Sequence, residues 1–163
     1  MSVRRILFVC TGNSCRSVMA QALMRHALAQ AGLQAIQVDS AGVFAMEGMP
    51  PTRETQRVLQ DAGFDCAGHR SRPLTGEMIE WADLILAMEP FQMEEVIRRV
   101  PGAKAKTHLL KTYGFSSVPP AERAGIPDPI GKPLEVYEVC FAEIREAVDR
   151  LATSFGVSPA EER

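Results

Sequence analysis

Short apolar runs alternate with amphipathic helical segments along most of this chain, and this order restricts the fold more than any other feature. Apolar runs typical of buried strands lie at 3–9, 34–40, 83–88 and 107–110. Strands that alternate with helices form a parallel sheet through right-handed crossovers, with helices on both faces. The sequence therefore predicts a three-layer α/β fold with a parallel sheet.

The helices between these strands are marked by apolar spacing and by capping residues. We expect a helix at 17–31, a helix that begins after Thr52 and ends near Gly63, a short helix after 75, a helix that opens at Pro90, and a long helix at 134–155. Residues 112–133, with five prolines and three glycines, read as a long loop. We expect one domain over 1–156 and a flexible tail over 157–163.

Composition excludes several classes of partner. The net charge is −2, so no basic excess favours nucleic acid or a membrane surface, and no apolar stretch approaches the length of a membrane span. The spacing of the four cysteines is not that of a zinc site, and Cys66 and Cys140 read as inert thiols. We expect a cytoplasmic monomer with no cofactor and no metal.

The loop after the first predicted strand carries the residues that point to chemistry. In such a turn, successive backbone N–H groups converge on an anion, and the following helix N-terminus adds positive potential. Gly12 and Asn13 are residue types that tolerate left-handed backbone conformations. The loop therefore predicts a binding site for a dianion such as a phosphoryl group. Its sequence is Cys10-Thr11-Gly12-Asn13-Ser14-Cys15-Arg16-Ser17.

We expect Cys10 at the rim of this loop, where the positive environment favours its thiolate and Ser17 can donate a hydrogen bond to it. The planar fork of Arg16 can hold two phosphoryl oxygens at once. Together these residues supply a nucleophile, oxyanion donors and a charge clamp. We do not expect a nucleotide-binding P-loop, because the chain has no G-x-x-x-x-G-K-[ST] pattern.

Transfer of a phosphoryl group to a cysteine also needs an acid for the leaving group and a base for water. Asp128 is the best candidate, because Pro127 and Pro129 stiffen the backbone on both sides of it. From the sequence pattern alone, however, an aspartate between two prolines is more often a solvated turn residue than a catalytic acid.

With these residues in view, the chain resembles the low-molecular-weight protein tyrosine phosphatase family over about 4–153. Residues 10–17 match the family pattern C-x-G-N-x-C-R-S in full. The resemblance implies a four-stranded parallel sheet and hydrolysis of protein phosphotyrosine through a phosphocysteine intermediate, without a metal. It implies Cys10 as nucleophile, Arg16 as phosphate clamp and Asp128 as general acid and then base.

Further residues extend the resemblance. Ser40 and His69 match a network that supports the loop asparagine, here Asn13. Cys15 matches a second loop cysteine, which implies reversible disulfide protection of Cys10.

The chain also departs from the tyrosine-specific pattern. Val18 replaces a proline, and Ile130 follows Asp-Pro where tyrosine-specific members carry tyrosine. The Asp-Pro-Ile-Gly segment, together with Ser14 and the segment around Phe44, is similar to the bacterial protein arginine phosphatases. Ser14, Ile130 and Phe44 are therefore candidate specificity residues, and phosphoarginine stands beside phosphotyrosine as a substrate.

Two other functions remain possible at this point. Thioredoxin-coupled arsenate reduction uses a similar loop but needs two further cysteines after the third strand, and residues 80–100 contain none. A non-catalytic module that binds phosphorylated protein would not need the complete set of Cys10, Arg16 and Asp128.

Overall fold

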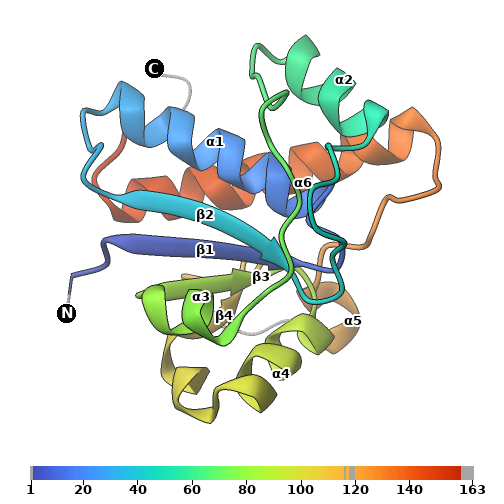
Figure 1. Ribbon diagram of the computed structural model, residues 1–163. Helices are drawn as coiled ribbons and strands as arrows, with labels where there is room; N and C mark the ends of the chain where they lie inside the picture. The colour runs from blue at the N-terminus through green and yellow to red at the C-terminus, as the bar shows by residue number, and fades with distance from the viewer. Residues whose placement is uncertain (1, 116, 118–119, 159–163) are drawn as a thin grey trace.

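The chain forms a four-stranded parallel sheet between two layers of helices, in a computed structural model that describes residues 2–115, 117 and 120–158 (Figure 1). The strand order is β2-β1-β3-β4. In chain order the elements are β1 (Arg5–Cys10), α1 (Arg16–Gln30), β2 (Gln37–Gly42), α2 (Arg53–Asp61), α3 (Gly76–Trp81), β3 (Leu84–Ala87), α4 (Pro90–Arg99), the 3-10 helix η1 (Pro101–Lys106), β4 (Thr107–Leu109), α5 (Ala121–Ala124) and α6 (Leu134–Ser154).

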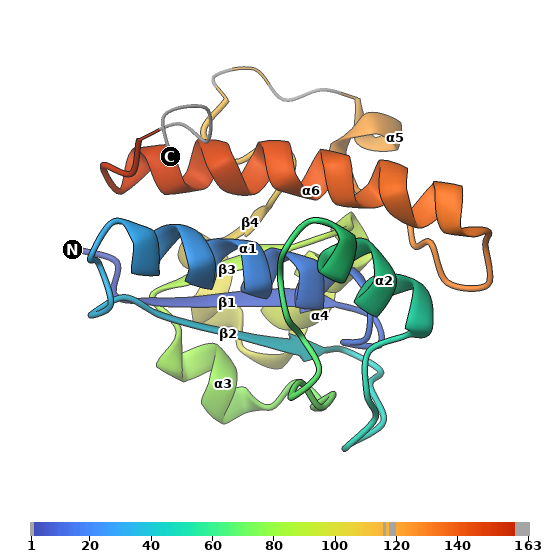
Figure 2. The same cartoon turned by 90° about the horizontal axis from the view of Figure 1, so that it is seen from above.

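The helices divide between the two faces of the sheet. Helices α1, α2 and α6 cover one face, and α3 and α4 cover the other, as two views at right angles show (Figures 1 and 2). Each strand pairs in parallel with its neighbours, and β1 lies between β2 and β3. The predicted three-layer fold with a four-stranded parallel sheet is confirmed.

The alternation of side chains along β1 fills both halves of the core. Ile6 and Phe8 pack with α1 and α6, whereas Leu7 and Val9 pack with side chains of α3 and α4. All four residues have no exposed surface, because successive side chains of a strand point to opposite faces and both faces are covered. The first strand is therefore fixed from above, from below and from both edges.

Helix boundaries follow their capping residues closely. The side chain of Thr52 accepts a hydrogen bond from the backbone N–H of Thr55 at the start of α2, and Pro90 occupies the first turn of α4. The long helix α6 buries Tyr137, Phe141 and the apolar positions that follow at helical spacing.

Three details differ from the sequence-based expectation. The 3-10 helix η1 was not predicted, and the segment at 112–133 contains the short helix α5. Val157, which we placed in the tail, is buried, and its N–H donates to the carbonyl of Ala152, so the packed domain extends through it. Ser158 is exposed, and the remainder of the predicted tail, 159–163, lies outside the described residues.

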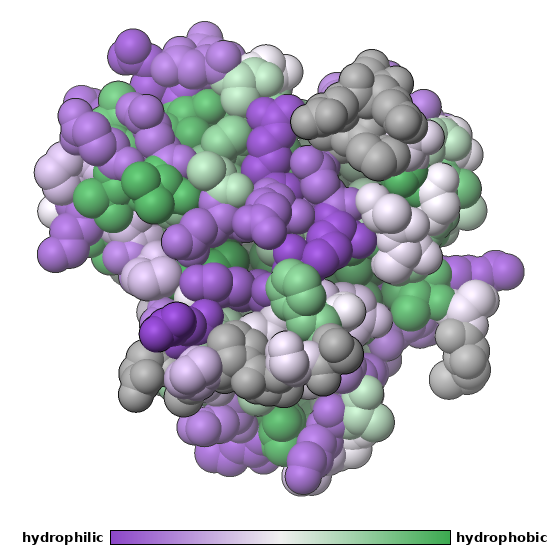
Figure 3. All heavy atoms as spheres, turned by 180° about the vertical axis from the view of Figure 1, so that it is seen from behind, coloured by the Kyte–Doolittle hydropathy of each residue, from purple (hydrophilic) through white to green (hydrophobic). Residues whose placement is uncertain are grey.

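The far side of the molecule is mainly hydrophilic. Figure 3 shows this side, with hydrophobic residues visible in separate groups among the hydrophilic ones. Within the part of the chain that the structure describes, no helix has both the length and the apolar character needed to cross a membrane.

Candidate active site

The loop between β1 and α1 lies at the carboxyl edge of the sheet, where ligands of parallel α/β folds bind. Because β1 is an inner strand, the segments that follow β2 and β3 flank the loop. The backbone N–H groups of Val43 and Phe44, just after β2, donate to the carbonyls of Cys10 and Thr11 at 2.9 and 3.0 Å. The N–H of Met88, just after β3, donates to the carbonyl of Val9. The sheet thus holds the start of the loop from both sides.

Cys10 lies on the floor of the loop rather than at its rim, with 2% of its surface exposed. The expectation of a rim position is wrong because Cys10 has the same alternation as Ile6 and Phe8, so it is directed toward the α1 and α6 layer. Its sulfur nevertheless meets polar groups of the loop. The backbone N–H of Asn13 donates to Sγ at 3.2 Å, and Ser17 Oγ lies 2.9 Å from Sγ.

Asn13 ties the loop together. It is the one described non-glycine residue with a positive φ, at 54°, a conformation that asparagine tolerates better than most residues. Its side-chain amide donates to Ser17 Oγ at 2.8 Å and to Ser40 Oγ at 2.9 Å. The backbone N–H of Arg72 donates to its Oδ1 at 3.0 Å, and His69 Nε2 lies 2.9 Å from its carbonyl oxygen. The structure therefore brings Ser40 and His69 to Asn13.

The protonation of His69 follows from this contact. A carbonyl oxygen only accepts hydrogen bonds, so we assign the proton of the neutral ring to Nε2. Burial, together with the positive charges of Arg25 and Arg72, lowers the pKa of His69 below its usual value. The ring therefore favours a neutral state that still donates to the loop.

Arg16, the first residue of α1, is almost completely buried with 1% exposure. Its Nη1 donates to the carbonyl of Ile126 at 2.7 Å and forms an ion pair with Glu89. Its Nη2 lies 3.5 Å from the carboxylate of Asp128. Burial alone would lower the pKa of Arg16, but Cys10, Glu89 and Asp128 together raise it, so the guanidinium stays charged.

Two polar residues that the sequence did not single out hold this site. Glu89 pairs with Arg16, and the buried Gln92 donates from Nε2 to Thr11 Oγ1 at 3.1 Å. The Oε1 atom of Gln92 accepts from the backbone N–H of Glu89 at 2.9 Å. The available signal was position: both residues follow the third apolar run, at the edge of the sheet where the first strand also ends.

Gly42 at the end of β2 lets the backbone approach the loop. A Cβ atom at this position would lie 2.5 Å from the carbonyl oxygen of Thr11 and 2.9 Å from the backbone nitrogen of Asn13. Only glycine fits such a contact without movement of the backbone. The segment that begins here carries Phe44, whose side chain is 68% exposed.

The remaining predicted site residues lie around the loop. Gly12 and Ser14 are half-buried, and Ser14 Oγ lies 3.7 Å from Cys15 Sγ. Asp128 is half-buried, and its Oδ1 accepts from the backbone N–H of Ile130 at 3.1 Å. The Ile130 side chain is exposed.

All four cysteines are free thiols. Cys15 is buried, with its sulfur 3.8 Å from the hydroxyl of Tyr137. Burial raises the pKa of Tyr137 and that of Cys140 to about 12 each, and it also raises the pKa of Cys66. Cys66 and Cys140 therefore favour the unreactive thiol form. Among the residues described, no group of His, Cys, Asp and Glu side chains is arranged to hold a metal ion.

Proteins of known family are similar to this chain over most of its length. The model of the low molecular weight phosphotyrosine protein phosphatase family matches residues 5–159. A protein-arginine-phosphatase of Geobacillus stearothermophilus is 42% identical over 91% of this chain and 93% of its own length. The low molecular weight protein-tyrosine-phosphatase Etp of Escherichia coli is 34% identical over 87% of this chain and 88% of its own length.

Solved structures of phosphatases superimpose on this chain over most of its length. A cysteine mutant of the YwlE arginine phosphatase with a phosphorylated active-site serine superimposes with a TM-score of 0.85 at 33% identity, covering 93% of this chain and 95% of that one. A structure of YwlE arginine phosphatase from Geobacillus stearothermophilus has a TM-score of 0.82 at 41% identity, covering 93% of this chain and 92% of that one.

Proposed function

The chain belongs to the low molecular weight phosphotyrosine protein phosphatase family, and from this premise we propose that it hydrolyses phosphorylated protein side chains with Cys10 as the nucleophile. One observation carries the assignment of Cys10. Its sulfur receives the backbone N–H of Asn13 and the contact of Ser17 Oγ, and Arg16 adds a buried positive charge beside the same loop. This environment favours a sulfur anion and a bound phosphoryl group together.

In the first step, the Cys10 thiolate attacks phosphorus in line with the leaving group. A sulfur–phosphorus bond forms as the bond to the substrate oxygen or nitrogen breaks. The Arg16 guanidinium, held by Glu89 and Ile126, stabilises charge on the phosphoryl oxygens. Asp128 is the general acid that protonates the departing group, because it lies within reach of Arg16 on a segment stiffened by prolines.

In the second step, water replaces the substrate. Asp128, now a carboxylate, takes a proton from water, which attacks phosphorus and breaks the sulfur–phosphorus bond. Inorganic phosphate leaves, and the Cys10 thiolate is restored. Asp128 regains from water in this step the proton that it gave to the leaving group in the first step, so the enzyme returns to its starting state.

Protein phosphotyrosine is the first candidate substrate, because the family to which the chain belongs is one of phosphotyrosine protein phosphatases. Phosphoarginine is a second candidate, supported by Ser14 and Ile130 and by the 42% identity to a protein-arginine-phosphatase. A guanidinium-linked phosphoryl group needs an acidic neighbour, and the half-buried Asp128 carboxylate can serve that role. A hydroxyl at position 14 leaves room for that group and offers it a hydrogen bond.

Hydrolysis of para-nitrophenyl phosphate by the wild type, Cys10→Ser and Asp128→Asn tests the mechanism. We expect no turnover with Cys10→Ser and a fall in kcat on the order of 100-fold with Asp128→Asn, the usual scale for loss of a general acid. Equal rates in all three proteins would refute the assignment. Wild-type enzyme that is denatured in acid during turnover retains its covalent intermediate. Mass spectrometry of this trapped protein should locate phosphate on Cys10.

Substrate choice is tested with peptides that carry phosphotyrosine or phosphoarginine in the same sequence. We expect Ser14→Ile to raise the ratio of kcat/KM for phosphotyrosine over phosphoarginine, because the larger side chain removes the hydroxyl and fills the space beside the loop. Ser14→Thr is the matched control, since it keeps the hydroxyl. A ratio that is the same in both variants contradicts this role of Ser14.

A further inference from the structure

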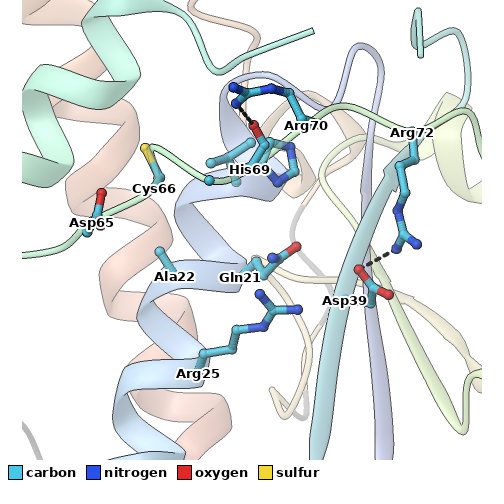
Figure 4. A pocket seen from close by; sticks show the side chains of 11 residues that line it. Gln21, Ala22, Arg25, Asp39, Asp65, Cys66, His69, Arg70 and Arg72 are labelled. Atoms are coloured by element: carbon cyan, nitrogen blue, oxygen red, sulfur yellow. Dashed lines mark hydrogen bonds and ion pairs between the residues drawn. The ribbon is translucent and has the colours of Figure 1, made fainter. Parts of the chain in front are cut away.

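A cavity lies beside the phosphate loop, outside the site already described. It has a volume of about 400 Å³, within the range of small-molecule sites, and it opens between α1, β2 and the segment that joins α2 to α3 (Figure 4). None of residues 10–17 lines it. The cavity is therefore separate from the position where the phosphoryl group of a substrate is held.

Three arginines from two parts of the chain line this cavity. Arg25 comes from α1, and Arg70 and Arg72 come from the segment before α3. Arg25 donates from Nε and Nη2 to one carbonyl oxygen, that of Val38, at 3.0 and 2.6 Å. Arg70 donates from Nη1 to the carbonyls of Ala67 and His69, and Figure 4 shows its side chain turned back to His69. Both guanidinium groups are thus oriented by uncharged backbone carbonyls, which do not neutralise their positive charges.

The acidic residues of the cavity do not cancel this charge. Asp39 forms an ion pair with Arg72, and Asp65 accepts the backbone N–H of Ala67 at 2.9 Å. Among the described residues, neither Arg25 nor Arg70 forms an ion pair. Three guanidinium groups against two carboxylates leave one net positive charge, and the planar forks suit phosphate oxygens.

We propose that this cavity binds a small organic phosphate and that its occupancy changes the phosphate loop of the active site. The volume accommodates an organic body as well as the phosphoryl group, and Arg25 and Arg70 supply the charge. The ligand is an effector rather than a substrate, because Cys10 does not line the cavity.

The link between the two sites runs through Asn13. His69 lies at the cavity wall and contacts the carbonyl oxygen of Asn13 at 2.9 Å. Arg72, also at the wall, donates its backbone N–H to Asn13 Oδ1 at 3.0 Å. An anion beside these residues changes the charge that acts on the His69 ring and the pairing of Arg72 with Asp39. Both changes reach the residue that orients Ser17 and the Cys10 sulfur.

Binding is tested first in an Arg16→Ala background, which removes the anion clamp of the active site. Glycerol 3-phosphate is titrated at alkaline pH, where a fraction of the Cys66 thiol ionises despite its raised pKa, and the alkylation of this residue of the cavity wall is followed by peptide mass spectrometry. We expect saturating ligand to slow alkylation at least threefold and to shift the amide signals of Gly68 and Ala22.

Two double variants decide whether the arginines are responsible. Arg25→Gln with Arg70→Gln should abolish the protection of Cys66. Arg57→Gln with Arg98→Gln removes the same charge from exposed positions outside the cavity and should leave the protection intact. Equal protection in both doubles, or none in the parent protein, would overturn the proposed site.

The effect on the active site rests on the proposed function and is measured separately with para-nitrophenyl phosphate. In the otherwise intact enzyme, we expect glycerol 3-phosphate to change kcat at least twofold, beyond any competitive effect on KM. Arg25→Gln with Arg70→Gln should lose this change, when its kcat with ligand is compared with its own kcat without ligand. An unchanged kcat in the wild type overturns the coupling, whereas absence of turnover refutes the phosphatase mechanism and leaves the binding experiment valid.

Discussion

The side-chain amide of Asn13 donates a hydrogen bond of 2.8 Å to Ser17 Oγ. The same hydroxyl lies 2.9 Å from Cys10 Sγ. A serine hydroxyl has one proton, and because its oxygen already accepts from Asn13, that proton is free to point at the sulfur. The asparagine therefore sets the direction in which Ser17 donates, and this direction favours a sulfur anion.

Removal of the Ser17 hydroxyl tests this arrangement. We expect Ser17→Ala to lower kcat/KM for para-nitrophenyl phosphate by about 10-fold to 100-fold, since a hydrogen bond to a charged group contributes about 1.5–3 kcal/mol. Alkylation of Cys10 by iodoacetate at pH 6 should slow in parallel. Ser154→Ala, a change near the end of α6, is the control. If Ser17→Ala alkylates as fast as the wild type, the hydroxyl does not support the thiolate.

The close approach of Gly42 to the loop gives a second prediction. Gly42→Ala places a Cβ atom 2.5 Å from the carbonyl oxygen of Thr11, so the backbone must move. We expect a loss of stability of about 1–3 kcal/mol, the usual cost of overpacking, together with a lower kcat. Gly102→Ala is a matched control because its Cβ would meet nothing within 4 Å. The free energy of unfolding of each variant is measured in urea, and equal values for the two would contradict the steric argument.

Glu89 provides a third prediction. Its carboxylate pairs with Arg16, whose side chain is 1% exposed, so a neutral partner leaves a buried charge less well compensated. We expect Glu89→Gln to lower the free energy of unfolding by about 1–3 kcal/mol. Glu146→Gln, which removes an exposed carboxylate from Arg150, should leave stability unchanged. The two urea midpoints measure the difference, and equal midpoints would show that Glu89 is dispensable.

His69 makes stability depend on pH in a defined direction. Its pKa is lowered in the folded protein from the usual value of 6.5, mainly by burial, so below that pH the unfolded chain takes up the proton first. The contribution is fully present above pH 6.5 and is lost as pH falls toward the folded pKa. His69→Gln keeps a side-chain N–H donor and does not titrate. Urea unfolding at pH 7.5, 6.5 and 5.5 gives the free energy of unfolding at each pH. This free energy should change less with pH in the variant than in the wild type, and an identical pH dependence would contradict the prediction.

Local patterns predicted the elements that carry the site. The first apolar run, the glycine and asparagine after it, and the helix that follows are neighbours in sequence, and they form β1, the loop and α1 with ends shifted by one or two residues. Thr52 and Pro90 marked helix starts correctly because capping depends on the few residues beside it.

Contacts set by the packing of the sheet were harder to foresee. Glu89 and Gln92 reach Arg16 and Thr11 across 73 and 81 positions of the sequence, and only the pairing of β1 with β3 brings them there. The orientation of Cys10 was missed for a related reason. The anion-binding pattern indicated a rim, but the alternation of side chains along β1 places the residue on the floor.

The order of residues along the chain has a consequence for synthesis on the ribosome. The loop that contains Cys10 is made early, but Arg16 is anchored by the carbonyl of Ile126, 110 positions later, and pairs with Asp128 beyond it. A nascent polypeptide thus contains Cys10 and Arg16 long before Ile126 and Asp128, which contact Arg16, have been added. The contacts that hold the Arg16 guanidinium can therefore form only during the last third of translation.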